Sequence, residues 1–307
     1  MNEVVTQLVT RVGAMKRCGD EPSRLVGQAE REEQVHVTLD GKTLRGTLSH
    51  EAADQRKMHQ VALYEMGTGL VLKEQVVGEK ENELSMVSQF LSPVWVKGRI
   101  ISADARPTQL TFCSDVTHGG GSFLLVAQGN QPTLRDDLQL FFSEPPPDCQ
   151  DWRTARTVDK GHGRLEIREV VASTELNDFL ANKWTGVAQV FRLVRTVTKK
   201  GQTSEEVVYG LTALSPAQAS AEELLALVRQ HWAIENRLHW RRDVTLREDH
   251  CQVRKGEAPR VLAVLNSCLL ALLDFVGVTN VPSQMRTFDA HPFLAVRLLL
   301  GSLLTFQ

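Results

Sequence analysis

The order of strand-like and helix-like segments between residues 35 and 127 most constrains the fold of this chain. Alternating and β-branched runs predict strands, whereas apolar residues three and four positions apart predict helices. Three strands come first, and the turn-forming sequence Gly67-Thr68-Gly69 joins the second to the third. The segments after them alternate between helix and strand. The expected strands are 35–39, 59–66, 70–77, 99–103 and 122–127, and the expected helices are 82–91 and 107–116.

Three meandering strands followed by alternating units predict an α/β fold, a mixed sheet with helices on its faces. This order fits a ribonuclease-H-like core. Asp40 ends the first expected strand, and Asp104 ends the fourth. Those two strands lie side by side in such a sheet, and ligand sites of open α/β sheets lie at the carboxyl ends of strands. We therefore expect both carboxylates at one edge of the sheet.

The second half of the chain is expected to add a β-rich insertion and then helices. Three prolines at 145–147 end a helix near 134–142, and two hairpins follow at 153–171 and 188–211. A long helix at 221–240 and an apolar helix at 258–275 come last. The expected organisation is a lead-in at 1–34, the first part of the core at 35–144, the insertion at 145–215 and a helical completion of the core at 216–307.

Three acidic residues from distant segments are the candidates for chemistry. Glu235 lies on the long helix, where two tryptophans and two histidines flank it and predict a setting poor in solvent. Magnesium prefers oxygen ligands and typically uses one or two carboxylates together with substrate phosphates. A pair of such ions can activate an attacking oxygen and stabilise a leaving one. Asp40, Asp104 and Glu235 therefore predict a metal site for phosphodiester chemistry.

Each acid also has an ordinary interpretation. An aspartate at a strand end is often a turn-former or a helix cap, and a glutamate on a helix is usually a solvated surface residue. A rival site uses the same helix, because His231, Glu235 and His239 are spaced four residues apart and can face one ion. Two histidines and a carboxylate suit zinc or iron. The order of these residues is not the H-E-x-x-H of a metalloprotease.

Composition limits the possible partners and compartments. The net charge is −2 and the pI is about 6.5, so any contact with nucleic acid must come from a local basic patch. Five scattered cysteines without a C-x-x-C pair argue against a zinc cage or a disulfide framework. The apolar stretch at 261–278 is interrupted by Asn266 and Asp274, which favours a buried core helix over a membrane span. With no visible secretory signal, we expect a cytoplasmic protein without a membrane partner.

The chain resembles the DDE transposases of bacterial insertion sequences, specifically the H-repeat-associated subfamily. The resemblance covers about residues 35–275 and rests on blocks that include VTLDGKTLRG, GRIISADARPTQ, LLVAQGNQPTL, DKGHGRLEIREV and RQHWAIENRLHWRRDVTLREDH. It implies that Asp40, Asp104 and Glu235 form the catalytic triad and hold Mg²⁺ or Mn²⁺ as two ions. It also implies cleavage of double-stranded DNA at element ends, joining to target DNA, a homodimer or higher multimer on DNA, and association with the bacterial nucleoid.

The resemblance also carries departures and alternatives. Val228, His231 and Arg242 stand where related transposases often have a tyrosine, an arginine and a lysine. Only 39 residues precede Asp40, which suggests a truncated copy. A remnant that only binds DNA and a nuclease without strand transfer therefore stay as alternatives. The candidates for contacts to DNA are Lys42, Arg45, Asn130, Gln131, His162, Arg164, Arg237, Arg241 and Arg242. Ordinary surface charge is an equal alternative for the first two, and turn chemistry is an equal alternative for Asn130 and Gln131.

Overall fold

The computed structural model describes residues 34–44, 58–77, 87, 90–104, 110–127, 131–161, 163–253 and 256–304. Its strands are β1 (Val35–Leu44), β2 (Met58–Glu65), β3 (Leu70–Val77), β4 (Arg99–Asp104), β5 (Ser122–Ala127), β6 (Arg153–Gly161), β7 (Arg164–Ser173), β8 (Gln189–Lys199) and β9 (Gln202–Thr212). Its α-helices are α3 (Pro93–Val96), α4 (Leu110–His118), α5 (Pro132–Ser143), α6 (Asn177–Ala181), α7 (Ala221–His231), α8 (Ala258–Phe275), α9 (Val281–Ala290) and α10 (Pro292–Leu304).

All of these strands belong to one mixed sheet with the order β3-β2-β1-β4-β5-β9-β8-β7-β6. The β1–β4 and β4–β5 pairs are parallel, and the other neighbours are antiparallel. The strands that carry Asp40 and Asp104 therefore lie side by side. This confirms the predicted ribonuclease-H-like sheet.

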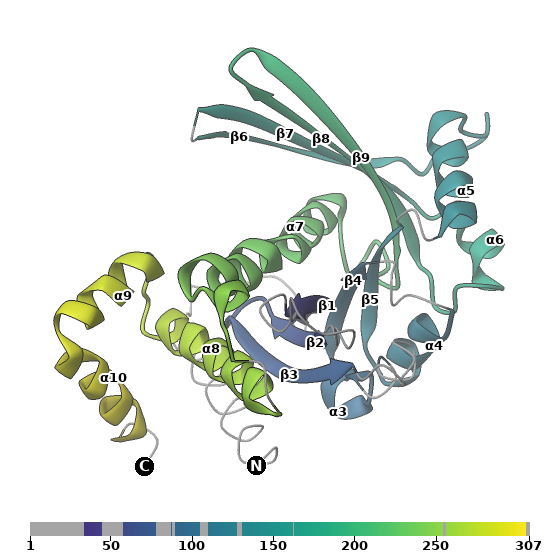
Figure 1. Ribbon diagram of the computed structural model, residues 1–307. Helices are drawn as coiled ribbons and strands as arrows, with labels where there is room; N and C mark the ends of the chain where they lie inside the picture. The colour runs from purple at the N-terminus through teal and green to yellow at the C-terminus, as the bar shows by residue number, and fades with distance from the viewer. Residues whose placement is uncertain are drawn as a thin grey trace, which may run out of the picture.

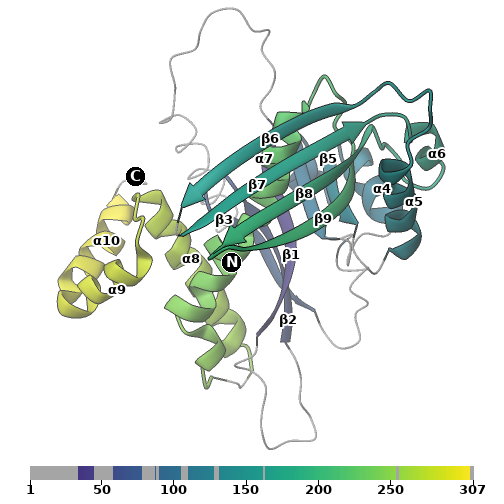
Figure 2. The same ribbon diagram turned by 90° about the horizontal axis from the view of Figure 1, so that it is seen from above.

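The β-rich segment between the second aspartate and Glu235 continues this sheet. Strand β9 pairs with β5, and β8, β7 and β6 follow it outward as an arched extension that passes over α7 (Figures 1 and 2). The junction is tight at Gly210, where an added Cβ would lie 2.3 Å from the Leu125 carbonyl oxygen and 2.2 Å from the Phe191 ring. A side chain at this position would force β5 and β9 apart.

The sheet is covered on both faces, because alternate residues of its strands are apolar on each side. One face, with Val37, Leu39, Ile101 and Phe123, packs against α4 and α5. On the other face, Ile100, Leu124 and the inner residues of β6–β8 pack against Leu224, Leu225 and Val228 of α7. Figure 1 shows α7 lying between the arched extension and the core sheet. The second face therefore carries the helix that leads to Glu235.

Helix α7 begins where its sequence predicts, but it ends early. Ser220 and Glu223 form a reciprocal capping box at its start. The expected continuous helix to residue 240 is wrong, because the α-helix ends at His231. Two π-helical turns follow, η2 (Glu235–His239) and η3 (Arg241–Thr245), and then a short 3₁₀ turn, η4 (Glu248–His250). Leu246 N–H donates to the Arg241 carbonyl at 2.9 Å, the i→i+5 bond of a π turn.

The apolar helix expected near 258–275 forms α8 at Ala258–Phe275. Its inner side joins a core cluster in which Leu270 and Leu273 meet Tyr64 of β2 and Ile234. By length and composition alone it is also apolar enough to cross a membrane, and about a third of it is buried (33%). The helix expected at 82–91 and the start of the one at 107–116 lie mostly outside the described residues.

Candidate active site

Asp40 and Asp104 lie on neighbouring strands and face the same side of the sheet. The register pairs Thr38 with Ser102 and Leu39 with Ala103, so the next residues of both strands project toward the face that carries α7. The expectation that Asp40 ends its strand is wrong. Strand β1 continues to Leu44, because it stays paired with β2 after its pairing with β4 has stopped. Asp40 therefore lies where the parallel pairing ends and has β2 on one side only.

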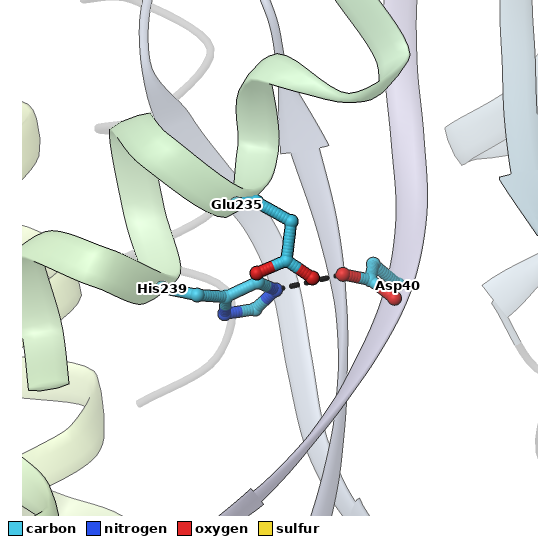
Figure 3. Close-up of side chains that lie close together, drawn as sticks. All are labelled: Asp40, Glu235 and His239. Atoms are coloured by element: carbon cyan, nitrogen blue, oxygen red, sulfur yellow. Dashed lines mark hydrogen bonds and ion pairs between the residues drawn. The ribbon is translucent and has the colours of Figure 1, made fainter. Parts of the chain in front are cut away.

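Glu235 reaches the Asp40 carboxylate from the first π turn. One ligand atom each of Asp40, Glu235 and His239 lies within 4.8 Å of the others (Figure 3). Asp40 Oδ2 is 2.8 Å from His239 Nε2, and Asp40 Oδ1 accepts the Gly41 N–H at 2.8 Å. Glu235 is exposed, so the expected low-solvent setting is wrong, and Trp240 beside it is 49% exposed. The cluster is therefore open to solvent at Glu235, whereas His239 is buried.

Asp104 lies outside this cluster. His231, at the end of α7, places its Nε2 3.0 Å from Asp104 Oδ1. The histidines of the helix are thus divided between the aspartates, with His231 on Asp104 and His239 on Asp40. This corrects two expectations, the close convergence of all three carboxylates and the rival site in which His231, Glu235 and His239 face one ion.

A buried hydrogen-bonded chain supports His231. Its Nδ1 lies 3.0 Å from Ser102 Oγ, which in turn lies 2.7 Å from His36 Nε2 and 3.1 Å from Thr38 Oγ1. The other ring nitrogen of His36 lies 2.9 Å from Gln230 Oε1. Burial lowers the pKa of His36 to about 4, despite the opposing hydrogen bond to Gln230 Oε1. His36 is therefore neutral at physiological pH.

The cluster of Asp40, Glu235 and His239 fits a divalent cation. Two oxygens that are each about 2.1 Å from one Mg²⁺ lie at most about 4.2 Å apart, so the observed spacing closes with small side-chain rotations. Within the described part of the chain, the Glu235 carboxylate has no hydrogen-bond or ion-pair partner, and the buried His239 Nδ1 also lacks one. Two carboxylates suit Mg²⁺ or Mn²⁺, and an imidazole adds a donor that transition metals favour.

Arg242, expected on a basic edge for DNA, is instead enclosed in the protein. Its side chain is 1% exposed, and its guanidinium donates to both carboxylate oxygens of Glu248 at 2.6 and 2.7 Å and to Glu74 at 2.6 Å. Burial opposes its charge, but the hydrogen bonds and charges of Glu248 and Glu74 outweigh burial and raise the pKa of Arg242. Lys42, another expected contact, pairs with Glu248 at 3.5 Å and with Asp243. Both cations therefore hold the protein together.

The other expected contacts to DNA are in varied settings. Arg237 and Arg241 share the carboxylate of Asp274 at 3.6 and 2.7 Å, and Arg237 also donates to the Met66 carbonyl at 2.5 Å. Arg164 is about half exposed beside Glu166 at the outer end of β7. Gln131 immediately precedes α5. The residues that lie outside the described part of the chain are Arg45, Asn130 and His162.

The residues that sequence reasoning missed are those that hold the aspartates. His36 and Ser102 lie inside apolar strands, where a single polar residue gives no local sign of its partner. The contacts of His231 and His239 with the aspartates did have a signal in the sequence, the regular H-x₃-E-x₃-H spacing. That spacing indicated a shared site but not which strand each histidine would contact.

Comparison with known proteins gives this chain a family. The family described as "Transposase DDE domain" matches residues 31–272. The chain belongs to the DDE transposase family. Two Escherichia coli K12 proteins, YbfL and the H repeat-associated YhhI, are each 30% identical over 261 residues, which cover 81% of this chain and 67% of theirs. A cryo-EM structure of a piggyBac transposase synaptic complex with hairpin DNA aligns with 82% of this chain and 51% of that one, at a TM-score of 0.43 and 9% identity.

The matches to H repeat-associated proteins confirm the subfamily that the sequence blocks indicated. The chain is thus a transposase by family, and the family works on DNA with divalent metal. The cluster of Asp40, Glu235 and His239 is a structural candidate for that metal's site.

Proposed function

We propose that this transposase cleaves double-stranded DNA at element ends and joins the freed 3′ hydroxyl to target DNA, using Asp40, Asp104 and Glu235 as its metal-holding carboxylates. The observation that carries the proposal is the approach of Glu235 to Asp40 from a segment almost two hundred residues away, on the face of the sheet that also carries Asp104. Mg²⁺ or Mn²⁺, as two ions, is the proposed cofactor.

Both reaction steps replace one phosphodiester bond by in-line attack of an oxygen at phosphorus. Bound divalent ions supply charge that activates the attacking oxygen and stabilises the leaving oxygen. The protein's own part is to hold the carboxylates in place. Hydrogen bonds from Gly41 N–H and the His239 ring fix both oxygens of Asp40. The exposure of Glu235 leaves room for a DNA backbone to enter from the solvent side.

A cleavage and joining assay tests this proposal. Purified protein is incubated with end-labelled element-end DNA and a supercoiled plasmid, with Mg²⁺ or Mn²⁺. We expect 3′ nicks and joined products from the natural chain and background levels from Asp40→Asn, Asp104→Asn and Glu235→Gln. Asp289→Asn, an exposed aspartate on α9, is the matched control and should cleave normally. Full cleavage by any one of the three site variants would refute the role of that residue.

The same assay separates the alternatives. Nicks without joined products would support a nuclease, and DNA binding without nicks would support a remnant.

We further propose that the active form is a homodimer or higher multimer on DNA, at the nucleoid in the cytoplasm. Light scattering of the complex with element-end DNA measures its stoichiometry. A single chain on each active complex would refute the multimer.

A further inference from the structure

We propose that His231 is a positioning residue that orients the Asp104 carboxylate, and that Ser102 and His36 fix the ring of His231 for this purpose. The inference rests on the proposed metal-holding role of Asp104. It assigns to the buried polar residues of β1 and β4 a function in the site, because their chain of contacts ends on a carboxylate of that site.

The contacts run without a gap from the surface of α7 to Asp104. They pass from Gln230 to His36 at 2.9 Å, to Ser102 at 2.7 Å, to His231 at 3.0 Å and to Asp104 at 3.0 Å. Ser102 is fully buried, and both histidines are less than a tenth exposed. Buried polar groups cost stability unless they are hydrogen-bonded, so this chain restricts each ring to one orientation.

The contact with Asp104 also fixes which atom of His231 donates. A carboxylate oxygen only accepts, so His231 Nε2, which lies 3.0 Å from Asp104 Oδ1, is the donor. The other ring nitrogen, Nδ1, meets the Ser102 hydroxyl, which can donate or accept. With a partner at each nitrogen, the ring keeps its Nε2 donor pointed at the carboxylate.

The histidines that contact the two aspartates differ in how firmly their rings are held. His239, which contacts Asp40, has a buried Nδ1 without a partner among the described residues. Its ring is fixed by one hydrogen bond, whereas the ring of His231 is fixed at both nitrogens. Asp104 is 37% exposed and Asp40 is 22% exposed, so the aspartate with more exposure to solvent is the one that meets the ring held at both nitrogens. A carboxylate held this way binds metal without losing side-chain freedom first.

Two substitutions separate the halves of the His231 ring. His231→Gln places an amide near the position of Nε2 and keeps a donor for Asp104, whereas His231→Asn places one near Nδ1 and keeps only the contact with Ser102. Ser102→Ala removes the support and leaves the imidazole in place. His118→Asn is the control, because His118 is an exposed histidine bonded only within α4. Each full-length variant is titrated with Mn²⁺ alone, and free Mn²⁺ is measured by electron paramagnetic resonance.

We expect His231→Asn to weaken Mn²⁺ binding on the order of 10-fold or more, as loss of a hydrogen bond to a metal ligand does. His231→Gln should stay within about 3-fold of the natural chain, Ser102→Ala should fall between them, and the control should be unchanged. Thermal unfolding of each variant identifies any failure to fold. If His231→Asn misfolds, the order of His231→Gln and Ser102→Ala decides the question, and equal binding by these two variants and the natural chain would overturn the proposal.

The outcome for the proposed function is separate. If the natural chain binds Mn²⁺ with the expected order of variants but does not cleave DNA, the positioning role stands and the transposition chemistry fails. If it cleaves DNA and His231→Asn binds Mn²⁺ and cleaves like the natural chain, the chemistry stands and the positioning role is wrong. No Mn²⁺ binding by the natural chain would overturn both.

Discussion

Replacement of Arg242 by methionine should destabilise the whole fold. Arg242 lies where five elements meet, because it bonds Gln60 of β2, Glu74 of β3, Glu248 of η4 and Ser267 of α8 from its own turn η3. Methionine fills a similar volume but leaves the carboxylates of Glu248 and Glu74 buried, at 8% and 5% exposure, without their main partner. The loss therefore includes the cost of two uncompensated charges.

The magnitude follows from this geometry. Removal of one partner from a buried ion pair costs about 3–5 kcal/mol, and Lys42 remains near Glu248 to offset a part of it. Unfolding entropy of about 2.1 cal/mol/K per residue gives roughly 0.6 kcal/mol/K for a chain of this size. The unfolding midpoint should therefore fall by about 5–8 °C. Arg242→Met combined with Glu248→Gln should recover a part of the loss, since one buried charge is then gone.

Calorimetry of Arg242→Met and the natural chain measures this effect. Arg260→Met is the matched control, because Arg260 pairs with Glu257 on the surface of α8 and should shift stability by less than about 1 kcal/mol. Burial raises the pKa of Glu248, but the hydrogen bonds to Arg242 outweigh burial and lower this pKa below its ordinary value of 4.5. The network is therefore intact above pH 4.5 and weakens as the pH falls below that value. The difference in unfolding midpoint between Arg242→Met and the natural chain should then become smaller in acid. An unchanged midpoint together with lost DNA binding would refute the reasoning and restore Arg242 as a DNA contact.

Other substitutions give further predictions. His36 has a pKa of about 4 in the folded protein and an ordinary value of 6.5, so acid protonates the unfolded chain first. The contribution of His36 to the free energy of unfolding is therefore complete above pH 6.5 and falls by about 2 kcal/mol between pH 7 and 5. Urea unfolding at both pH values should show a smaller decrease for His36→Gln, and an equal decrease would contradict the assignment. Gly210→Ala should cost about 2–3 kcal/mol in the same assay, because its Cβ meets the backbone of β5. Ser220→Ala should cost about 1 kcal/mol by removing the capping box of α7, and a cost near zero would mean that the cap is not needed.

The strand order of the core could be predicted because each strand has a local signal. Runs such as 35–39, 99–103 and 122–127 are short, apolar and bounded by turn residues, and their order admits few topologies. The two hairpins were visible for the same reason. The pairing of these hairpins with the core could not be predicted, because strands β9 and β5 are 75 or more residues apart in the sequence. Their contact also depends on the close approach at Gly210.

The site was predicted less well than the sheet, because burial of a charged residue depends on partners from distant segments. Arg242 and Glu235 are seven positions apart in one polar stretch, and nothing local shows that the arginine is enclosed and the glutamate exposed. Glu74, one of the two carboxylate partners of Arg242, lies on β3, 168 residues earlier. Residue type identified the candidate chemistry, whereas only the packing of β2, β3 and α8 assigned Arg242 a structural role.

The change from α-helix to π turn explains how one helix contacts both strand aspartates. In a regular α-helix, residues four apart are rotated by about 40° beyond a full turn, so eight residues rotate a side chain by about 80°. His239 would then turn away from the face that His231 presents to Asp104. A π turn is wider because it closes i→i+5 bonds, so residues four apart fall short of a full turn and the rotation is reversed. With an α-helix that ends at His231 and a π turn from Glu235 to His239, the two histidines face the sheet, and each contacts its own aspartate.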